Sequence, residues 1–429
     1  MTIELVAMAA VFVVLMVIRV PVAFAIMGAV ATYFLATPGP DAIFPQRMVA
    51  SLGSFPVLAV PFFVLAGTAM ARGGMAMRLI GLADALVGHV RGGLGQVNVL
   101  NSLFIGGMSG SAKADSAIDA RILVPVMVKH GYSLGFSSAL TAASSIISPL
   151  LPPSIALILY GLLAGVSIGQ LFIAGIIPAI IVAIALMILV RVKAGRHNYG
   201  AVRLRRMPIR QVLVKVRESW LALLMPVGII AGLRLGVFTP TELGAVIAVY
   251  ALVVGLFVYK EIKWRDLGKL FTEAALLSAG ILVIIAAAGA LGYVLTFERI
   301  PQQLALSLTS VIDEPWIALI VINVALLLLG MVMESTSLLI IVTPVLAPVV
   351  ITMGIDPVQF GVVLALNMVI GGITPPIGGN MFTVCAITGC SIAEFTKEIM
   401  VFIAVLVGIL AAVSFIPALT LALPAILLP

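Results

Sequence analysis

The sequence has very little charge. Of its 429 residues, 10% are Asp, Glu, Lys or Arg and 62% are hydrophobic, whereas a soluble domain has about 25% charged residues. A soluble fold could not bury so much apolar surface, so this composition excludes a soluble protein. Apolar runs recur from Ile3 to Leu428. Since a bilayer-crossing helix needs roughly 20 apolar residues, we expect about ten to twelve membrane segments.

Cysteine, histidine and catalytic motifs are also scarce. The two cysteines, Cys385 and Cys390, lie in apolar sequence, which favours packing over a disulfide and provides no metal site. The three histidines are far apart, and the sequence has neither His-Glu-x-x-His nor a phosphate loop ending in Gly-Lys-Ser/Thr. These absences argue against an enzyme and against an ATP-driven pump. The opening stretch has Glu4 in place of basic residues and no cleavage site, so we interpret it as a first span.

Positive charge is concentrated in the segment 191–217, which has nine basic residues and no Asp or Glu. The positive-inside rule predicts that this segment is a cytoplasmic loop. It links two long apolar segments and has few aromatic residues, so it is not expected to bind nucleic acid. The net charge of +7 therefore reports orientation in the bilayer.

The two parts of the chain on either side of this loop resemble each other. Matching residues recur at nearly constant separations of 222, 219, 224 and 223 positions; these pairs are Asn101 and Asn323, Pro125 and Pro344, Phe136 and Phe360, and Pro152 and Pro375. Internal repeats with interrupted apolar segments are typical of secondary transporters. We therefore predict an all-α polytopic membrane protein with two repeated halves.

Each half contains an apolar segment interrupted by prolines. In the first half, 134–148 is too short to cross a bilayer at ~1.5 Å per residue, and Pro149, Pro152 and Pro153 separate it from 154–163. In the second half, Pro375 and Pro376 separate 360–374 from 377–388. We predict a re-entrant helical hairpin in each half, and because non-helical backbone at membrane depth must face protein or water, an internal polar site between them.

Charges close to these segments have two interpretations. Four charged residues lie within nine positions: Lys113, Asp115, Asp119 and Arg121. They lie either in an aqueous turn or facing a cavity. Lys113 and Asp115, and Asp119 and Arg121, are candidate pairs that would neutralise each other. Glu334 occupies the equivalent place in the second half and either lines the same cavity or caps the next helix. The segments 75–90 and 263–273 are mixed polar and apolar, as in helices that lie in the membrane interface or in plain loops.

Six short strings together give the chain a family resemblance: 61–67, 109–115, 144–154, 238–245, 330–334 and 373–378. With these strings the chain resembles, over nearly its full length, the large DctM-type membrane subunit of TRAP (tripartite ATP-independent periplasmic) transporters. Lys113 and Ser148 depart from the family pattern, in which a small or apolar residue and a Gly or Ala are usual.

This resemblance implies an elevator-type fold, with a scaffold that carries arm helices and a mobile transport domain that holds two hairpins. It implies sodium coupling, an organic-anion (carboxylate) substrate, the bacterial inner membrane, a small four-span DctQ-type subunit and a periplasmic DctP-type solute-binding protein. The segments are then scaffold spans with an arm helix (1–90), the first repeat (91–190, hairpin about 134–163), the basic cytoplasmic loop (191–217), scaffold spans with an arm helix (218–312), the second repeat (313–390, hairpin about 360–388) and a C-terminal span (391–429).

We call the proline-containing breaks between 134–148 and 154–163, and between 360–374 and 377–388, the two interruptions. We expect sodium to bind there, because a hard cation takes oxygen ligands and unwound backbone carbonyls supply them. The sodium candidates are Ser144, Ser145, Gly371, Gly372, Thr374, Gly378 and Asn380. The substrate candidates are Pro152, Pro153, Ser154, Pro375, Pro376, Lys113 and Asp115. Alternatively, the prolines only shape a kink and the hydroxyls bond back to their own helices.

Two other functions remain open on the sequence alone. An ion-coupled carboxylate carrier working without a binding protein would contain the same interruptions and differ in its partners. A passive channel would not require paired interrupted segments.

Overall fold

The computed structural model describes residues 3–37, 42–197, 199–200, 206–311 and 314–428, and within these ranges the chain is helical with no strand. The elements before the first repeat are α1 (Ile3–Val17), α2 (Val22–Ala36), α3 (Ile43–Leu52), η1 (Phe55–Leu58), α4 (Ala59–Arg72) and α5 (Met75–Val87). Those between the repeats are α12 (Ile209–Arg234), α13 (Pro240–Val253), η3 (Val254–Val258), η4 (Trp264–Asp266), α14 (Leu267–Phe297) and α15 (Ile300–Val311).

The two repeats contain corresponding helices in the same order. The first consists of α6 (Gly93–Ser109), α7 (Ala112–Lys129), α8 (Leu134–Ser144), η2 (Ser145–Leu150), α9 (Ile155–Ala164), α10 (Ile168–Ala174) and α11 (Ile176–His197). The second consists of α16 (Pro315–Gly330), α17 (Ser335–Thr352), α18 (Pro357–Ile373), α19 (Gly379–Thr388), α20 (Ile392–Phe415) and α21 (Ala418–Leu427). The repeat inferred from matching residues is thus a repeat of helices.

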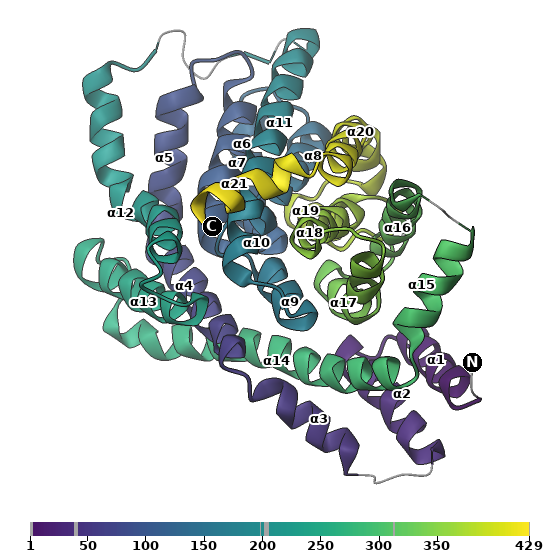
Figure 1. Ribbon diagram of the computed structural model, residues 1–429. Helices are drawn as coiled ribbons and strands as arrows, with labels where there is room; N and C mark the ends of the chain where they lie inside the picture. Colours follow the sequence, from purple (N-terminus) through teal and green to yellow (C-terminus); the bar gives the residue numbers. More distant parts are fainter. Residues whose placement is uncertain (1–2, 38–41, 198, 201–205, 312–313, 429) are drawn as a thin grey trace.

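The two repeats are interlocked. Helix α7 of the first packs against α19 of the second, and α17 of the second packs against α9 of the first. The two interruptions also meet, because η2 packs against α18. Helix α14 runs across the lower part of Figure 1, above α3, and packs against α2, α3, α4 and α17. It therefore joins the N-terminal helices to the second repeat.

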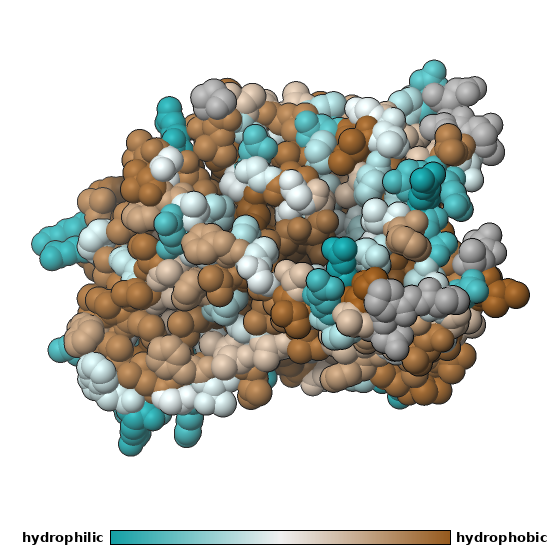
Figure 2. Space-filling view, turned by 60° about the horizontal axis from the view of Figure 1, so that its bottom comes forward, coloured by the Kyte–Doolittle hydropathy of each residue, from teal (hydrophilic) through white to brown (hydrophobic). Residues whose placement is uncertain are grey.

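The helices are apolar enough for a membrane but several are short. Within the described residues, seven helices meet the length and composition of a membrane span, and six further apolar helices have 10–17 residues. The shorter ones include α1 and α2, with 15 residues each. Brown hydrophobic side chains cover most of the face shown in Figure 2, as a lipid-facing surface requires.

The prolines interrupt the helices where the sequence predicts. Helix α8 gives way to η2 at Ser145 and α9 begins at Ile155, while α18 ends at Ile373 and α19 begins at Gly379. The relative orientation in the first repeat differs from the expectation, because the bend between the two pieces is 44°. That is the geometry of an interrupted helix, whereas a hairpin over 134–163 would have to fold back on itself.

The first repeat does contain a helical hairpin, but it precedes the interruption. Helices α6 and α7 pack against each other and are joined by only two residues, so they must run antiparallel. The corresponding pair in the second repeat is α16 and α17, joined by 331–334. In the first repeat, reading the proline cluster as a hairpin tip therefore placed the hairpin one helix too late.

Two other segments differ from their sequence interpretation. Residues 263–273 form η4 and the start of the 31-residue α14, so they are not a separate helix. The basic segment 191–217 is mostly the ends of α11 and α12, with residues 198 and 201–205 outside the described residues. Lys193 on α11 pairs with Glu398 on α20 at 2.6 Å.

Candidate functional site

The connections that precede the two interruptions have matching caps. Ser111 is the N-cap of α7 and its hydroxyl accepts from the backbone N–H of Ala114 at 3.4 Å. Glu334 is the N-cap of α17 and its carboxylate accepts from the backbone N–H of Ser337 at 2.9 Å. These caps satisfy N–H groups at helix starts and fix where each helix begins.

Glycine allows each connection to lie against an interruption. Gly110 has φ +58°, and a Cβ there would lie 1.9 Å from the carbonyl oxygen of Pro153. A Cβ at Gly106 would lie 2.9 Å from Cα of Ser148, and at the equivalent Gly330 it would lie 3.0 Å from Cα of Gly371. Helices α6 and α16 therefore each approach an interruption backbone to backbone, at equivalent positions in the two repeats.

The first interruption carries buried hydroxyls that are all hydrogen-bonded. Ser144 Oγ donates to Asn98 Oδ1 at 2.7 Å, and Ser148 Oγ donates to Asp115 Oδ2 at 2.7 Å. Ser145 Oγ donates to the carbonyl of Ala142 at 2.8 Å. These contacts fix η2 against α6 and α7.

The second interruption has fewer side chains and more backbone at its centre. Thr374 Oγ1 donates to the carbonyl of Ile370 at 2.6 Å, and its N–H donates to the carbonyl of Gly371 at 3.0 Å. A Cβ at Gly378 would lie 2.6 Å from Gly372 O and 2.9 Å from Thr374 O. Two carbonyl oxygens therefore converge beside Gly378, which is an arrangement that suits a cation.

One hydrogen bond joins the two interruptions directly. Asn380 Nδ2 at the start of α19 donates to Ser145 Oγ at 2.9 Å, and Asn380 Oδ1 accepts from Ser116 Oγ on α7 at 2.5 Å. Ser145 and Asn380 were both predicted as sodium ligands from opposite halves, and the structure brings them into contact. The hydroxyls of Ser145 and Thr374 also bond back to their own helices, as the alternative interpretation expected.

Several backbone carbonyls at the two interruptions have hydrogen-bond partners. The Ser148 carbonyl accepts from Leu151 N–H at 3.3 Å, and the Pro149 carbonyl accepts from Ser154 Oγ at 2.5 Å. The Gly371 carbonyl accepts from Thr374 N–H. The prolines remove their own N–H donors, but neighbouring residues in η2 and after α18 replace them. These carbonyls can contribute to a cation site only through a second lone pair.

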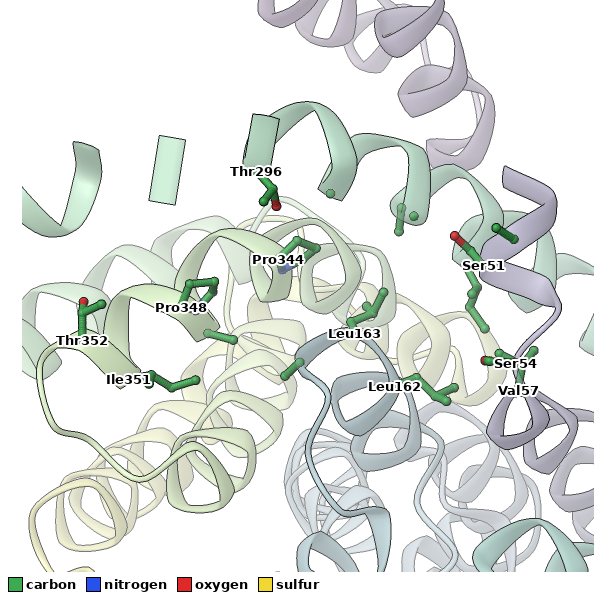
Figure 3. A pocket seen from close by; sticks show the side chains of 17 residues that line it. Ser51, Ser54, Val57, Leu162, Leu163, Thr296, Pro344, Pro348, Ile351 and Thr352 are labelled. Carbon is green, nitrogen blue, oxygen red and sulfur yellow. The ribbon is translucent and has the colours of Figure 1, made fainter. Parts of the chain in front are cut away.

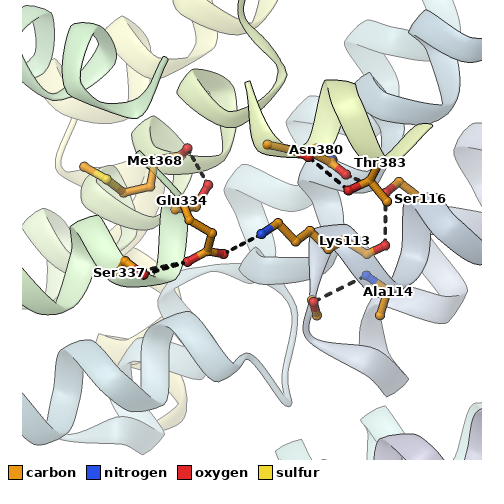
Figure 4. Close-up of polar contacts among 11 residues, drawn as sticks. Lys113, Ala114, Ser116, Glu334, Ser337, Met368, Asn380 and Thr383 are labelled. Atoms are coloured by element: carbon orange, nitrogen blue, oxygen red, sulfur yellow. Dashed lines mark hydrogen bonds and ion pairs between the residues drawn. The ribbon is translucent and has the colours of Figure 1, made fainter. Parts of the chain in front are cut away.

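A cavity of about 610 Å³ opens between the repeats and helices α4 and α14. Its polar lining comes from both repeats and from α4 and α14. The repeats contribute Ser109, Ser111, Lys113, Glu334, Ser335, Thr336 and Asn380, and the other two helices contribute Thr68, Arg72 and Glu273. Lys113 Nζ lies 3.0 Å from Glu334 Oε1, and Figure 4 shows this ion pair reaching across from α7 to the start of α17. The hydroxyls, the Asn380 amide and the Lys113 ammonium can together bind an anionic solute.

Comparison with known proteins gives the family. Residues 9–419 match the model of the tripartite ATP-independent periplasmic transporter, DctM component. The chain belongs to the DctM family of TRAP transporters.

Its curated relatives include large permease proteins with different named solutes. The chain is 37% identical to the 2,3-diketo-L-gulonate TRAP transporter large permease protein of Escherichia coli (87% of this chain, 88% of that one). It is 36% identical to the sialic acid TRAP transporter large permease protein of Vibrio cholerae, with 95% of each chain covered. It is 35% identical to the C4-dicarboxylate TRAP transporter large permease protein of Pseudomonas aeruginosa, with 86% of each chain covered.

A solved structure shares the fold at much lower identity. The Alcanivorax borkumensis YdaH transporter superposes with a TM-score of 0.63 at 16% identity, over 89% of each chain. At this identity the likeness concerns the fold alone.

Most of the predicted substrate residues of this DctM-family chain do not line the cavity. Lys113 does. Pro152 and Pro153 are buried, and Ser154, which is fully buried, caps α9 by accepting from Leu157 N–H at 3.1 Å. Pro375 and Pro376 lie in the second interruption but are not among the lining residues.

Asp115 and Asp119 also differ from the expectation. Both are fully buried on α7, and neither is among the residues that line the cavity. Neither candidate neutralising pair forms, since Lys113 pairs with Glu334 and Asp119 Oδ1 accepts from Asn101 Nδ2 at 2.7 Å. Sequence proximity suggested pairs between residues two apart, but such residues do not face each other on a helix.

Sequence reasoning missed the asparagines that support the interruptions. Asn98 on α6 accepts from Ser144, and Asn367 on α18 donates through Nδ2 to Asn323 Oδ1 on α16 at 2.8 Å. Ser144 and Asn367 lie 223 positions apart, so each repeat bonds its interrupted helix to an asparagine on the first helix of its hairpin. An asparagine within an apolar run is costly unless it is paired, and that signal was available.

A second cavity lies elsewhere and has a different lining. It measures about 640 Å³ between α3, α9, α14 and α17, and Figure 3 shows Leu162, Pro344 and Ser51 around it. Among the described residues that line it there is no charged side chain. This lining differs from that of the cavity at Lys113, which contains charged side chains from both repeats.

Proposed function

We propose that this chain is the large permease subunit of a TRAP transporter in the bacterial inner membrane, where it couples uptake of an organic anion, a carboxylate, to sodium. The observation that carries the proposal is the contact between Ser145 and Asn380, which joins the two interruptions. The adjacent cavity contains Lys113 and hydroxyls from both repeats. A site built at the interface of two repeats is what alternating access requires.

The sodium ligands proposed are the oxygens at the two interruptions: Ser144, Ser145, Gly371, Gly372, Thr374, Gly378 and Asn380. The converging carbonyls of Gly372 and Thr374 support the second site. The N-terminal ends of α9 and α19 follow directly on the interruptions, and a helix N-terminus favours an anion. Binding of cation and solute would thus depend on the same backbone.

The exposed fraction of the Lys113–Glu334 pair supports a role in solute binding. The two side chains are 43% and 35% exposed, so water and a small anion can reach them. A carboxylate that enters the cavity would compete with Glu334 for the Lys113 ammonium. We propose Lys113 as the residue that contacts the anionic group of the solute.

The proposed partners are a small four-span DctQ-type subunit and a periplasmic DctP-type binding protein. A relative from Oleidesulfovibrio alaskensis, an isethionate TRAP transporter permease protein named DctMQ, is 33% identical, and this chain covers 64% of its length. The additional length and the name of that relative support a partner subunit for this chain. We propose that the segment 191–217 lies on the cytoplasmic side of the membrane.

The test is uptake into proteoliposomes that contain the chain with its small subunit and a loaded binding protein. The solute is first chosen by thermal stabilisation of the binding protein with C4-dicarboxylates, sialic acid and sugar acids. An inward sodium gradient should drive accumulation, and replacement of sodium by potassium should abolish it. Accumulation that is independent of the sodium gradient would contradict the coupling.

Two variants test the cation ligands in that assay. Ser145→Ala and Thr374→Ala should each raise the half-saturating sodium concentration, because each removes an oxygen at one interruption. Thr32→Val is the control, since the Thr32 hydroxyl bonds back to Gly28 O on α2, outside the interruptions and the cavity. Unchanged sodium dependence in both test variants would remove these residues from the site.

A further inference from the structure

The cavity at Lys113 contains a second ion pair. Arg72, the last residue of α4, pairs through Nη2 with Oε2 of Glu273 on α14, and both residues line the cavity. Their side chains are 44% and 45% exposed. Lys113 and Glu334 belong to the two repeats, whereas α4 and α14 lie outside them. The cavity is therefore lined by one ion pair from the repeats and one from the helices beside them.

The wall formed by α4 and α14 is otherwise poor in groups that bind an anion. On each helix the lining residues include three spaced four apart: Val64, Thr68 and Arg72 on α4, and Glu273, Leu277 and Ile281 on α14. The Thr68 hydroxyl donates to the Val64 carbonyl at 2.9 Å. Among the described residues of this wall, Arg72 is the one cation that faces the cavity.

Arg72 has hydrogen-bond donors to spare. A guanidinium has five N–H donors, and within the described part of the chain only Nη2 of Arg72 donates, to Glu273. Its planar fork matches the two oxygens of a carboxylate. Because the side chain is partly exposed, a carboxylate in the cavity can reach the free donors or displace Glu273.

The Arg72–Glu273 pair also lies where the cavity meets a second hollow. An open hollow of about 770 Å³ lies beside the first turns of α14, and its lining includes Arg265 and Lys269. The cavity and this hollow share Arg72, Glu273 and Leu277. A solute that moves between the hollow and the cavity would therefore pass the guanidinium of Arg72.

The solute contacts from the repeats and from α4 belong to different bodies of the protein. The repeats interlock through α7 with α19 and through α17 with α9, while α4 packs chiefly against α13 and α14. Alternating access moves one body of helices against another around the site. Lys113 stays with the site in the repeats, whereas Arg72 belongs to the other body.

We infer that Arg72 binds the anionic group of the solute in only one of the two access states. It then increases the affinity for the solute on one face of the membrane, while Lys113 does so on both. A contact made in one state alone also shifts the equilibrium between the states. The inference rests on the proposed function, the uptake of an organic anion.

The test is Arg72→Gln in the complete transporter, with its small subunit, in proteoliposomes. Two concentrations are measured: that of loaded binding protein outside that half-saturates uptake, and that of solute inside that half-inhibits it. Arg72→Gln should raise one of them about fivefold and leave the other unchanged, as expected for loss of a partly exposed charge contact. Lys113→Ala should raise both.

Two further variants separate solute binding from a structural role of the pair. Glu273→Gln should lower the concentration that Arg72→Gln raises, because the solute no longer competes with Glu273 for the guanidinium. Arg72→Lys keeps the charge but loses the fork, so it should give a smaller increase, and it serves if Arg72→Gln fails to assemble. Lys215→Gln is the control, since its pair with Glu218 lies outside the cavity and the hollow.

The outcomes distinguish this inference from the proposed function. Equal increases in both concentrations for Arg72→Gln would show a contact in both states and overturn the inference. Shifts of Arg72→Gln and Glu273→Gln in the same direction, or no shift in either, would show that the pair acts only in the structure. In these cases uptake by the wild type still supports the function. If the wild type takes up no organic anion, the proposed function itself is wrong.

Discussion

The two repeats have the same backbone plan but different chemistry. In the first, the interruption is formed by η2, whose residues Ser145 to Leu150 are all buried, and it lies beside two carboxylates. In the second, the interruption is a turn after α18 in which Pro376 and Ile377 are exposed, and the equivalent helix α17 has Leu338 and Val342 in place of the acids. Symmetry of the fold therefore does not imply equal side-chain chemistry at the two interruptions.

The largest effect is expected where the first hairpin touches its interruption. Gly110→Ala would place a Cβ 1.9 Å from Pro153 O at a φ of +58°. Because the neighbouring atom is backbone, the connection must move, and we expect loss of transport and a destabilisation of about 2 kcal/mol or more. Solute uptake measures the loss of transport, and thermal unfolding of the purified complex measures the loss of stability.

Gly131→Ala is the matched control for this variant. Gly131 also has a positive φ, +87°, but nothing lies within 4 Å of its added Cβ. It should lose only about 1 kcal/mol from backbone strain and keep transport. Equal behaviour of the two variants would show that the close approach at Pro153 has no role.

A smaller effect is expected at the ion pair that links the repeats. Lys113→Ala should raise the solute KM about tenfold, since it removes the proposed anion contact and leaves Glu334 in the cavity. Stability should change by less than about 1 kcal/mol, because the pair is partly exposed. Uptake kinetics and unfolding of the same preparation test both parts.

Lys215→Ala provides a control with similar exposure. Lys215 pairs with Glu218 at 2.7 Å, with side chains 39% and 44% exposed, and neither residue lines the cavity. Removing the Lys215 side chain should leave the KM for the solute unchanged. If Lys113→Ala also leaves KM unchanged, the solute does not contact Lys113 and the anion site must be sought elsewhere.

The sequence predicts the repeat and the limits of the interrupted helices well, because proline acts locally. Pro149 and Pro375 end helices through the loss of an N–H, whatever the rest of the fold does. The sequence does not predict orientation, because a bend of 44° and a full reversal begin with the same residues. The hairpin was therefore assigned to 134–163 when it lies at α6–α7.

Candidate residues could be named from the sequence within one repeat, but their contacts across the repeats could not. Ser145 and Asn380 were each identified from their own interruption, yet their hydrogen bond depends on the packing of η2 against α18. The partner of Lys113 is Glu334, 221 residues away, and no local pattern indicates it. Charge pairs chosen by proximity in the chain failed for the same reason.

The smallest effect is expected for the hydrogen bonds that both repeats share. Ser144→Ala would leave Asn98 Oδ1 without its donor, and Asn367→Ala would remove the bonds to Asn323. Because intramembrane hydrogen bonds contribute modestly, each variant should lose about 1 kcal/mol. Chemical or thermal unfolding in detergent measures this loss, with Thr32→Val as the control, because the Thr32 hydroxyl bonds back to its own helix.

These two variants also distinguish structural from ion-binding roles. Both should lose similar stability, but only Ser144→Ala should raise the half-saturating sodium concentration, because Ser144 is a proposed ligand and Asn367 is a support. The comparison matters because Ser144 Oγ already has a partner in Asn98 at 2.7 Å. An equal sodium response in both variants would mean that the hydroxyl acts only through packing of α8 against α6, and Ser144 would leave the proposed ligand set.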